Sequence, residues 1–357
     1  MIDKTIQSIG GRIALELAIQ NNLKWLNKSF SHNKDFGSSA YCNVLGMWSG
    51  PYPETTGYLL PTLVKARKIL NDTYWIDLAG KQLLYFERIQ NNDGSFKREN
   101  GKKALVFDTS QILLGLCVLS KENIFVTEKP SIEKAYLWIL SRINDEGEFT
   151  DNNFVKDYNP SYYSRIIWAL LEAEKIIGIK TDLKTIKLYD NIKSLQNPNG
   201  TFDKFAFSPD EPGYTHTLIY TIRGLWESAK LLQDSQGITK MESTVNVLDD
   251  LINRKGKLAG SYNDNWNGDY SFVCSVGNCQ LALLKVLMKK RDGSADALKN
   301  IDLLLKPVLK SQRMAGLNKG AIPSSIPIYG KYQRFKYTNW TQKFFLDSIL
   351  ELLDYSK

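Results

Sequence analysis

The sequence predicts an all-α protein, an (α/α)6 toroid in which six helix pairs close into a double ring. The first observation behind this prediction is a phrase that returns about every fifty residues, as QNNDGSF at 90–96, INDEGEF at 143–149 and QNPNGTF at 196–202, with a degenerate copy at 254–266. Each copy follows an apolar helical pattern, and its glycine can end a helix because glycine takes left-handed conformations with little strain. A period of this length indicates helix-turn-helix units.

The second observation is that two kinds of helix alternate along the chain. Some segments, such as SQILLGLCVL and NCQLALLKVLM, are apolar on nearly all faces, as expected for helices enclosed by others, whereas the segments between them keep a charged stripe. The apolar set is therefore expected to lie inside. Outer helices are predicted over 10–28, 75–90, 131–143, 183–196, 241–253 and 295–312, and inner helices over 55–71, 108–120, 161–177, 215–232, 271–290 and 339–354.

Six such pairs can be arranged in two ways. An open solenoid would expose a concave groove. A closed ring encloses the whole inner set, so the apolar inner helices favour closure, and a closed ring makes one domain of residues 1–357. Strand-like alternation is weak throughout, which agrees with an all-α protein.

Charge and short motifs limit the classes of function. The net charge of +8 and the pI near 9.0 come from lysines and arginines spread along the chain, without a block of like charges. This indicates a generally basic solvated surface rather than a nucleic-acid binder, and it leaves acidic small molecules or acidic glycans open as ligands. No GxGxxG or GxxxxGK[ST] motif is present to hold phosphates, so no nucleotide cofactor is expected.

Cysteines, histidines and the N-terminal segment add further expectations. Cys42, Cys117, Cys274 and Cys279 show no CxxC spacing, and only two histidines are available, so we expect no structural metal, no cofactor and no disulfide. The segment MIDKTIQSIGGRIALELAIQ lacks the pattern of a signal peptide, and no window approaches the ~18 apolar residues of a membrane span. A cytoplasmic protein is therefore expected.

Candidate chemistry gathers at one end of the predicted ring. All inner helices of a closed ring run the same way, so their N-terminal ends and the preceding loops meet at one mouth. The stretch GMWSGPYPETTGYLLPTL at 46–63 places Glu54 and Tyr58 there. Helix capping explains part of this pattern, since Thr55, Asp108 and Thr215 are residue types that accept hydrogen bonds from free backbone amides. Capping does not explain the tyrosines, arginines and tryptophan beside them.

Electrostatics favour an anionic ligand at this mouth, because six helix N-termini directed at one basin give a positive potential. Arg165 and Arg223 lie in inner helices that otherwise resemble core. An arginine is seldom buried without a partner, so each either pairs with a carboxylate such as Glu172 or Glu227, or points into the basin. Those carboxylates lie in the wrong direction along the helix to neutralise a group near the mouth, which favours the basin.

Residue types then suggest roles. His216, beside other polar side chains, can act as a general base or acid, and aromatic residues offer flat apolar faces for sugar rings. The candidate catalytic residues are His216, Tyr162, Tyr163, Glu54 and Asp108. The candidate substrate-binding residues are Arg165, Arg223, Tyr58, Gln111, Tyr220, Asn278, Trp266, Trp340 and Lys343.

The inner-helix phrases resemble a family of bacterial and archaeal proteins found with polysaccharide and surface-glycan biosynthesis genes and described as VpsJ-like or prenyltransferase-like α-toroids. The phrases are YPETTGYLLPTL, FDTSQILLGL, YYSRIIWALLEAEK, THTLIYTIRGLWESA, SVGNCQLALLKV and NWTQKFFLDSIL, and the likeness covers about residues 40 to 354. It implies a six-fold toroid and a role in glycan assembly, with other glycan-assembly proteins as partners. The architecture is more distantly similar to terpene cyclases and protein prenyltransferases, but their DxDD, aspartate-rich and zinc-ligand motifs are missing here, which disfavours an isoprenoid reaction.

Three functions agree with these observations. The first is an enzyme that abstracts a proton beside a uronate carboxylate, giving C5 epimerisation or elimination: Arg165 and Arg223 would bind the acid, and His216, Tyr162 and Tyr163 would move protons. The second is a glycoside hydrolase that uses Glu54 and Asp108. The third is a glycan-binding or assembly scaffold without catalysis.

Overall fold

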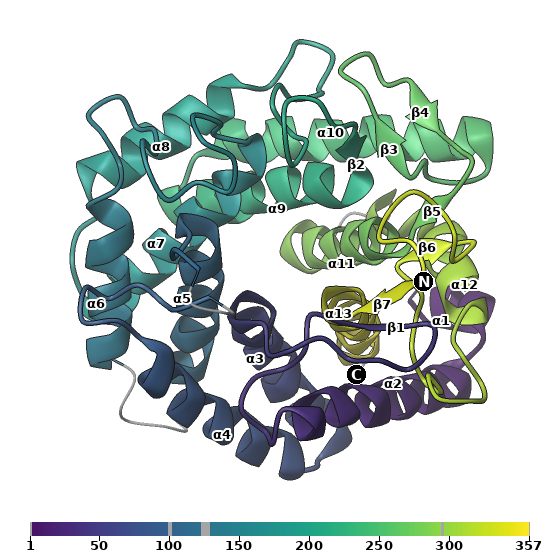
Figure 1. Ribbon diagram of the computed structural model, residues 1–357. Coiled ribbons are helices and arrows are strands. Elements are labelled where there is room, and N and C mark those ends of the chain that lie inside the picture. Colours follow the sequence, from purple (N-terminus) through teal and green to yellow (C-terminus); the bar gives the residue numbers. More distant parts are fainter. Residues whose placement is uncertain (1, 99–101, 123–128, 294–295, 357) are drawn as a thin grey trace.

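The computed structural model describes residues 2–98, 102–122, 129–293 and 296–356, and its helices form two concentric rings (Figure 1). The inner helices are α3 (Pro53–Leu70), α5 (Val106–Lys121), α7 (Ser164–Ile177), α9 (Thr215–Leu232), α11 (Ser275–Asp292) and α13 (Asn339–Tyr355). The outer helices are α2 (Arg12–His32), α4 (Tyr74–Ile89), α6 (Lys129–Leu140), α8 (Leu183–Ser194), α10 (Ser235–Lys255) and α12 (Ile301–Lys310). The predicted toroid is confirmed.

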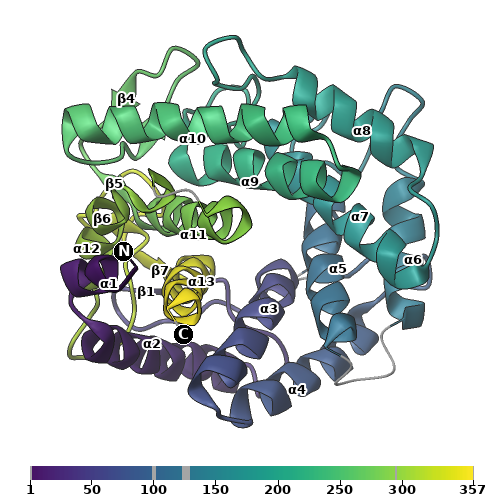
Figure 2. The ribbon, with the colours of Figure 1, turned by 180° about the vertical axis from the view of Figure 1, so that it is seen from behind.

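The inner ring is closed. Each inner helix packs against the next one along the chain, and α13 packs against both α11 and α3, so the last inner helix contacts the first. Figure 2 shows the same ring from behind, with the outer helices around the inner ones. The open solenoid is therefore excluded. That the whole of residues 1–357 forms a single domain stays a prediction.

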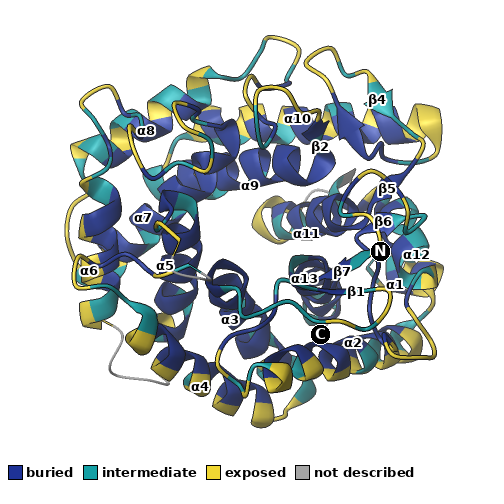
Figure 3. Ribbon diagram, viewed as in Figure 1, coloured by how far each residue is buried: buried dark blue, intermediate teal, exposed yellow. Residues whose placement is uncertain are grey.

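Burial follows the predicted division between the two rings (Figure 3). About three quarters of the residues of α5, α9 and α13 are buried, whereas the outer helices expose one face to solvent. This pattern is the reason for the continuous apolar runs in the inner helices and the charged stripes in the outer ones. The element boundaries differ mainly at α10, which begins six residues before its predicted start at 241, and at α12, which begins six residues after its predicted start at 295. An additional helix α1 (Ile2–Ile9) precedes α2.

The recurring phrases form tight turns between the rings. In the first phrase the backbone amide of Asn91 donates to the carbonyl of Ser95, and Gln90 bridges Phe96; the phrases at 143–149 and 196–202 close in the same way. Gly94 has φ +97°, so it lies in the turn rather than at the helix end, where Gln90 is the C-cap. The expectation that these glycines end the helices is therefore wrong by a few residues.

Short strands join the loops that precede the inner helices. β1 (Tyr41–Asn43) pairs with β7 (Lys336–Thr338), and β5 (Val273–Cys274) pairs with β6 (Ser325–Ile326), all antiparallel. A third sheet has the order β2–β3–β4, from β2 (Gly213–Tyr214), β3 (Ser261–Tyr262) and β4 (Gly268–Asp269). The strands therefore fix the N-terminal ends of the inner helices against each other. Among the described helices, none combines the length and the apolar character that crossing a membrane requires.

Glycines set the distance between α3 and α5. A Cβ atom built on Gly57 would lie 2.5 Å from the Cα of Ile112, and one built on Gly115 would lie 2.1 Å from the carbonyl oxygen of Gly57. These two backbones can approach each other only because neither position carries a side chain. This contact fixes how close the N-terminal turns of α3 and α5 lie.

Adding one methyl group at this contact is expected to destabilise the protein. Gly115→Ala would force α3 and α5 apart, at an overpacking cost of roughly 1–3 kcal/mol. The free energy of unfolding, measured by urea denaturation, should fall by that amount, while Ser243→Ala on the exposed face of α10 should leave it unchanged. An unchanged urea midpoint in Gly115→Ala would contradict the close helix contact.

Candidate functional site

A cavity of about 610 Å³ opens at the N-terminal ends of the inner helices. Its walls come from the first turns of α3, α5, α9 and α13 and from the loops that precede them. The lining residues are Tyr52, Glu54, Tyr58, Leu105, Phe107, Asp108, Phe154, Tyr162, Phe207, Glu211, Tyr214, His216, Tyr220, Lys331, Tyr332, Gln333, Arg334, Lys336 and Trp340.

The structure brings half of the sequence-predicted site residues together in this cavity. Those that line it are Glu54, Tyr58, Asp108, Tyr162, His216, Tyr220 and Trp340. Those that do not are Gln111, Tyr163, Arg165, Arg223, Trp266, Asn278 and Lys343. The predicted residues that line the cavity are thus acidic or aromatic, apart from His216, and none of the predicted cations Arg165, Arg223 and Lys343 is among them.

The polar side chains at the helix starts are not caps. The N-cap residues of α3, α5 and α9 are Tyr52, Leu105 and Tyr214, and no side chain accepts a capping hydrogen bond at any of them. Thr55 instead bonds to Glu54 and Tyr58, and the Thr215 hydroxyl donates to a backbone carbonyl. Capping therefore does not account for the carboxylates of this site.

Glu54 and Asp108 are the two buried carboxyl groups of the cavity. Glu54 lies in the first turn of α3 and Asp108 in the first turn of α5, each with about 7% of its surface exposed. Burial raises the pKa of Glu54 well above its ordinary value, and the charge of Asp108 raises it further. Both effects favour the protonated form of Glu54, whose Oε2 accepts a hydrogen bond from Thr55 at 3.2 Å.

Asp108 has a cationic partner that Glu54 lacks. Nε of Arg98 lies 2.8 Å from Oδ2 of Asp108, and Arg98 also bonds to Tyr52. Burial raises the pKa of Asp108 to about 6, and Arg98 limits this rise. Burial thus favours the protonated form of Glu54, whereas the ion pair with Arg98 favours the ionised form of Asp108, a separation of roles that catalytic pairs of carboxyl groups require.

His216 lies on the opposite wall, in the first turn of α9. Its Nδ1 is 3.2 Å from Oε1 of Gln280, so Nδ1 carries the proton and Nε2 is left as an acceptor. Burial lowers the pKa of His216 to about 3. The ring is therefore neutral and a weak base, suited to accept a hydrogen bond from a substrate hydroxyl.

Aromatic rings form most of the cavity wall. Phe107 and Tyr162 meet edge to face with centroids 5.2 Å apart, and Tyr162 meets Phe207 at 5.7 Å. Across the cavity Tyr332 contacts both Tyr214 and His216 at 5.1 and 5.6 Å. Burial raises the pKa of Tyr162 and Tyr332 well above the ordinary value, so both hydroxyls stay protonated and can donate. Flat faces beside hydroxyl donors suit a sugar ring.

Two predicted substrate-binding residues have structural partners instead. The amide of Asn278 donates to the carbonyl of Leu304 between α11 and α12, and the indole N–H of Trp266 donates to the carbonyl of Asn199 in an outer loop. Tyr163, a predicted catalytic residue, packs behind the cavity wall against Phe149 at 5.6 Å. The expected place of these three residues at the mouth is thus corrected.

The predicted arginine cluster lies deeper in the ring. Nε of Arg165 donates to Oε1 of Gln111 at 2.7 Å, and the guanidinium lies under the ring of Tyr220, 4.5 Å from its centroid. Nε of Arg223 lies 3.7 Å from Oε1 of Glu227, the carboxylate partner weighed above. Arg165 lies deep because the 3-10 helix η2 (Ser161–Tyr163) precedes α7, so Tyr162 takes the place at the mouth. Neither arginine lines the cavity.

The cations that do line the cavity come from a segment without helical periodicity. Lys331, Arg334 and Lys336 lie in the connection between α12 and α13, at the rim, where Lys331 also pairs with Asp269 at 2.7 Å. In the sequence, IYGKYQRFKYTNW at 328–340 carries the only available signal, alternating basic and aromatic residues before an inner helix. Among the described residues, no group of three or more His, Cys, Asp or Glu side chains is placed to hold a metal ion.

The whole chain is similar in structure to solved carbohydrate enzymes. A heparin-specific unsaturated glucuronyl hydrolase matches with a TM-score of 0.72 at 13% identity, over 97% of this chain and 98% of its own. The unsaturated glucuronyl hydrolase of Streptococcus agalactiae matches at 0.70 and 15%, over 98% and 95%. Cellobiose 2-epimerase from Bacillus thermoamylovorans matches at 0.70 and 11%, over 92% and 96%.

The sequence itself matches no protein-family model and no curated protein. The VpsJ-like resemblance therefore stays a prediction. At identities of 15% or less the structural likeness concerns the fold, and it shows that this chain is an α/α toroid of the kind found in these hydrolases and epimerases.

Proposed function

We propose that the protein hydrolyses a glycosidic bond in an acidic oligosaccharide. The observation that carries this proposal is the pair of buried carboxyl groups on the cavity floor, of which Asp108 forms an ion pair with Arg98 while burial favours the protonated form of Glu54. Both line a cavity whose aromatic walls and size fit a few sugar rings. This favours the second of the three functions considered from the sequence.

Each carboxyl group has one role in the reaction. Glu54 gives its proton to the glycosidic oxygen as the bond between that oxygen and the anomeric carbon breaks. Asp108 stabilises the positive charge that develops on the sugar ring and takes the proton of the water that adds to the anomeric carbon. Arg98 keeps Asp108 ionised, and His216 and Tyr162 orient the sugar hydroxyls through hydrogen bonds.

Proton abstraction beside a uronate, the first of the three functions, has less support from the site. It needs a base that takes a proton from carbon, yet burial lowers the pKa of His216 to about 3 and keeps Tyr162 protonated. Asp108 is the carboxylate that could serve, but Arg98 holds it in an ion pair. Epimerisation or elimination is therefore the alternative, with Asp108 as its base.

An acidic substrate is supported by the rim. Lys331, Arg334 and Lys336 line the cavity, and among the described residues that line it Glu211 is the one acidic residue besides the carboxyl pair. The structural relatives include unsaturated glucuronyl hydrolases, one of which was solved with the disaccharide dGlcA-GalNAc6S. A sugar carboxylate or sulfate near the rim cations is the arrangement we propose here.

The biological process and the cellular compartment are inferred from the VpsJ-like resemblance and from the four cysteines. The likeness to glycan-biosynthesis toroids supports polysaccharide biosynthesis as the process and other glycan-assembly proteins as partners. All four cysteines are buried free thiols, which supports a reducing compartment such as the cytoplasm.

Cleavage of defined acidic oligosaccharides tests the proposal. We expect new reducing ends to appear with uronate-containing oligosaccharides, and proton NMR of the first product to show a single anomer. The retained anomer would mean that Asp108 attacks the anomeric carbon directly, and the inverted anomer that it activates water. Deuterium entering C5 of the uronate without cleavage would contradict hydrolysis and support the alternative.

Removing the rim cations should weaken binding of acidic substrates only. In the double variant Lys331→Gln and Arg334→Gln, KM for an acidic oligosaccharide should rise about tenfold while kcat changes little, since the cations act equally on substrate and transition state. KM for the matching neutral oligosaccharide should stay unchanged. Lys319→Gln, an exposed lysine outside the cavity, serves as the control. An equal rise in KM for both substrates would contradict charge recognition at the rim.

A further inference from the structure

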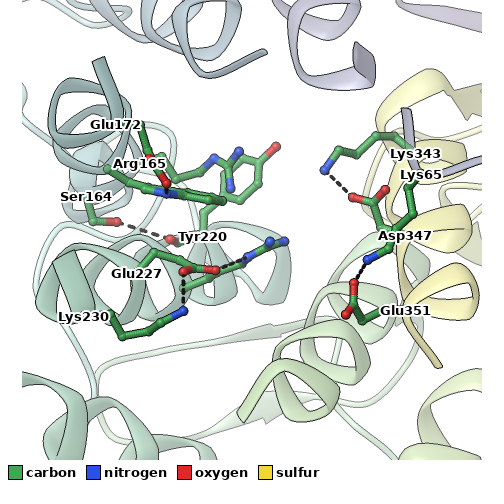
Figure 4. A network of polar contacts seen from close by, with 12 residues as sticks. Lys65, Ser164, Arg165, Glu172, Tyr220, Glu227, Lys230, Lys343, Asp347 and Glu351 are labelled. Carbon is green, nitrogen blue, oxygen red and sulfur yellow. Dashed lines mark hydrogen bonds and ion pairs between the residues drawn. The ribbon is translucent and has the colours of Figure 1, made fainter. Parts of the chain in front are cut away.

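A second group of cations lies inside the ring, beneath the floor of the cavity. It consists of Arg165 on α7, Arg223 on α9 and Lys343 on α13. Figure 4 shows Arg165 with Tyr220 on one side of the ring interior, and Lys343 with Asp347 on the other. None of the three cations lines the cavity.

An aromatic layer separates this group from the cavity. Tyr58 and Tyr220 face the cavity and pack on Phe344, with centroids 6.2 and 5.7 Å from that ring. Nζ of Lys343 lies 3.9 Å from the centroid of Phe344, and the Arg165 guanidinium lies 4.5 Å from that of Tyr220. The proposed glycoside site and the cation group are therefore distinct.

The arginines carry buried N–H groups without an acceptor. NH1 of Arg165, and both Nε and NH1 of Arg223, have no hydrogen-bond partner among the described residues. The guanidinium carbons of Arg165 and Arg223 lie 5.4 and 5.1 Å from the centroid of the Trp168 indole, a contact that attracts the cations but supplies no oxygen acceptor. The N–H bonds lie in the guanidinium plane, so they still need acceptors. A buried donor left unpaired costs about 1–3 kcal/mol, and more for a charged group.

Charge points the same way. Glu227 is shared between Arg223 and Lys230, and Asp347 pairs with Lys343. Among the described residues, no carboxylate forms an ion pair with Arg165, which pairs with the neutral amide of Gln111 instead. Burial lowers the pKa of Lys343 to about 8, and both arginines add to this effect, which shows that the three cations repel one another.

We propose that a small inorganic anion, a halide or an oxyanion such as phosphate, binds between Arg165, Arg223 and Lys343 on the axis of the ring. The anion accepts the unpaired N–H bonds of the two arginines and offsets the repulsion among the three cations. It joins α7, α9 and α13, helices from both halves of the ring. The ligand is an anion that stabilises the toroid, and this role does not depend on glycoside hydrolysis.

Thermal unfolding in different salts tests the anion site. Potassium chloride, bromide and phosphate are each titrated against potassium gluconate at constant ionic strength. We expect a saturable rise in Tm of roughly 2–4 °C with the anion that binds, because a ligand bound only to the folded state stabilises it. The arm with the larger shift identifies the class, halide or oxyanion. No rise in any arm would overturn the proposal.

Matched variants locate the effect. Arg223→Gln, which removes the guanidinium but keeps a polar side chain, should lose the anion-dependent shift, whereas Arg254→Gln on the exposed face of α10 should keep it. Crystals soaked in bromide should show an anomalous peak between the Arg165, Arg223 and Lys343 side chains. A shift of the same size in both variants would overturn the site. If bromide is the anion that raises the Tm, bromide peaks only at the outer surface would overturn it as well. Turnover is not a readout, so the result is independent of the proposed hydrolysis.

Discussion

Replacing Glu54 by Gln is expected to lower kcat for an acidic oligosaccharide by about 100- to 10,000-fold. The amide keeps the shape and the neutral charge of the protonated carboxyl group, but it cannot give a proton to the leaving oxygen. KM should change little because the contacts to the substrate stay. Initial rates of reducing-end formation measure the effect, with the exposed Glu146→Gln as control.

The leaving group shows whether Glu54 acts as the acid. A nitrophenyl glycoside leaves as a stabilised phenolate and needs little protonation, so Glu54→Gln should cleave it nearly as fast as the natural chain does. Equal loss of rate on both substrates would contradict the role of Glu54 as general acid.

The same substitution should make the protein more stable at neutral pH. The pKa of Glu54 is higher in the folded state than in the unfolded state, so the unfolded state releases the proton at lower pH. The stability that the protonated Glu54 contributes is therefore lost as pH rises from 4.5 through the folded-state pKa. Gln removes this loss. The Tm of Glu54→Gln should therefore exceed that of the natural chain at pH 7 and approach it near pH 4.5. Thermal unfolding at the two pH values measures this difference and also shows that the variant is folded.

Asp108→Asn is expected to lower kcat by at least about 1,000-fold with both the natural and the nitrophenyl substrate. The amide can neither stabilise positive charge at the anomeric carbon nor take a proton from water, whatever the leaving group. Asp145→Asn, an exposed change in the turn at 143–149, should keep full activity.

The pH profile assigns the carboxylate. The pKa of Asp108 is about 6, and its ionised form is the active one, so kcat/KM should rise as pH increases through about 6. Loss of the proton from Glu54 then gives the alkaline limb. Asp108→Ala should regain part of its rate with added formate, which supplies the missing carboxylate. If Asp108→Asn cleaved the nitrophenyl substrate at a rate within tenfold of the natural chain, the result would contradict the role of Asp108 as the catalytic carboxylate.

Much of the fold could be predicted because it depends on local signals. The turns at 90–96, 143–149 and 196–202 repeat the same residues, and the inner helices are apolar all round because the outer ring covers them. α1 was not predicted: Ile2, Ile6 and Ile9 do follow helical spacing, but the pattern spans only eight residues. The glycines at 94, 147 and 200 were expected to end the helices, but they lie in the turns that follow. Glycine is favoured at both kinds of position, so the residue type alone does not distinguish them.

The site could be predicted only in part. Glu54, Asp108 and His216 were found because each lies in the first turn of an inner helix, and helix direction alone brings those turns together. Arg165 was misplaced because the 3-10 turn before α7 shifts it one turn inward. The rim cations Lys331 and Arg334 belong to a long connection without periodicity, so their position depends on tertiary contacts that no local pattern records.

Ring closure has a consequence for how the cavity is assembled. Glu54 comes from the first inner helix and Trp340 from the last, and Tyr41 lies opposite Thr338 in the pairing of β1 with β7. Bringing together residues so far apart in the sequence costs chain entropy, and only the contacts made on docking offset this cost, so such contacts form late. On the ribosome, the emerging polypeptide therefore holds no substrate until the final inner helix has been made and has docked beside α3.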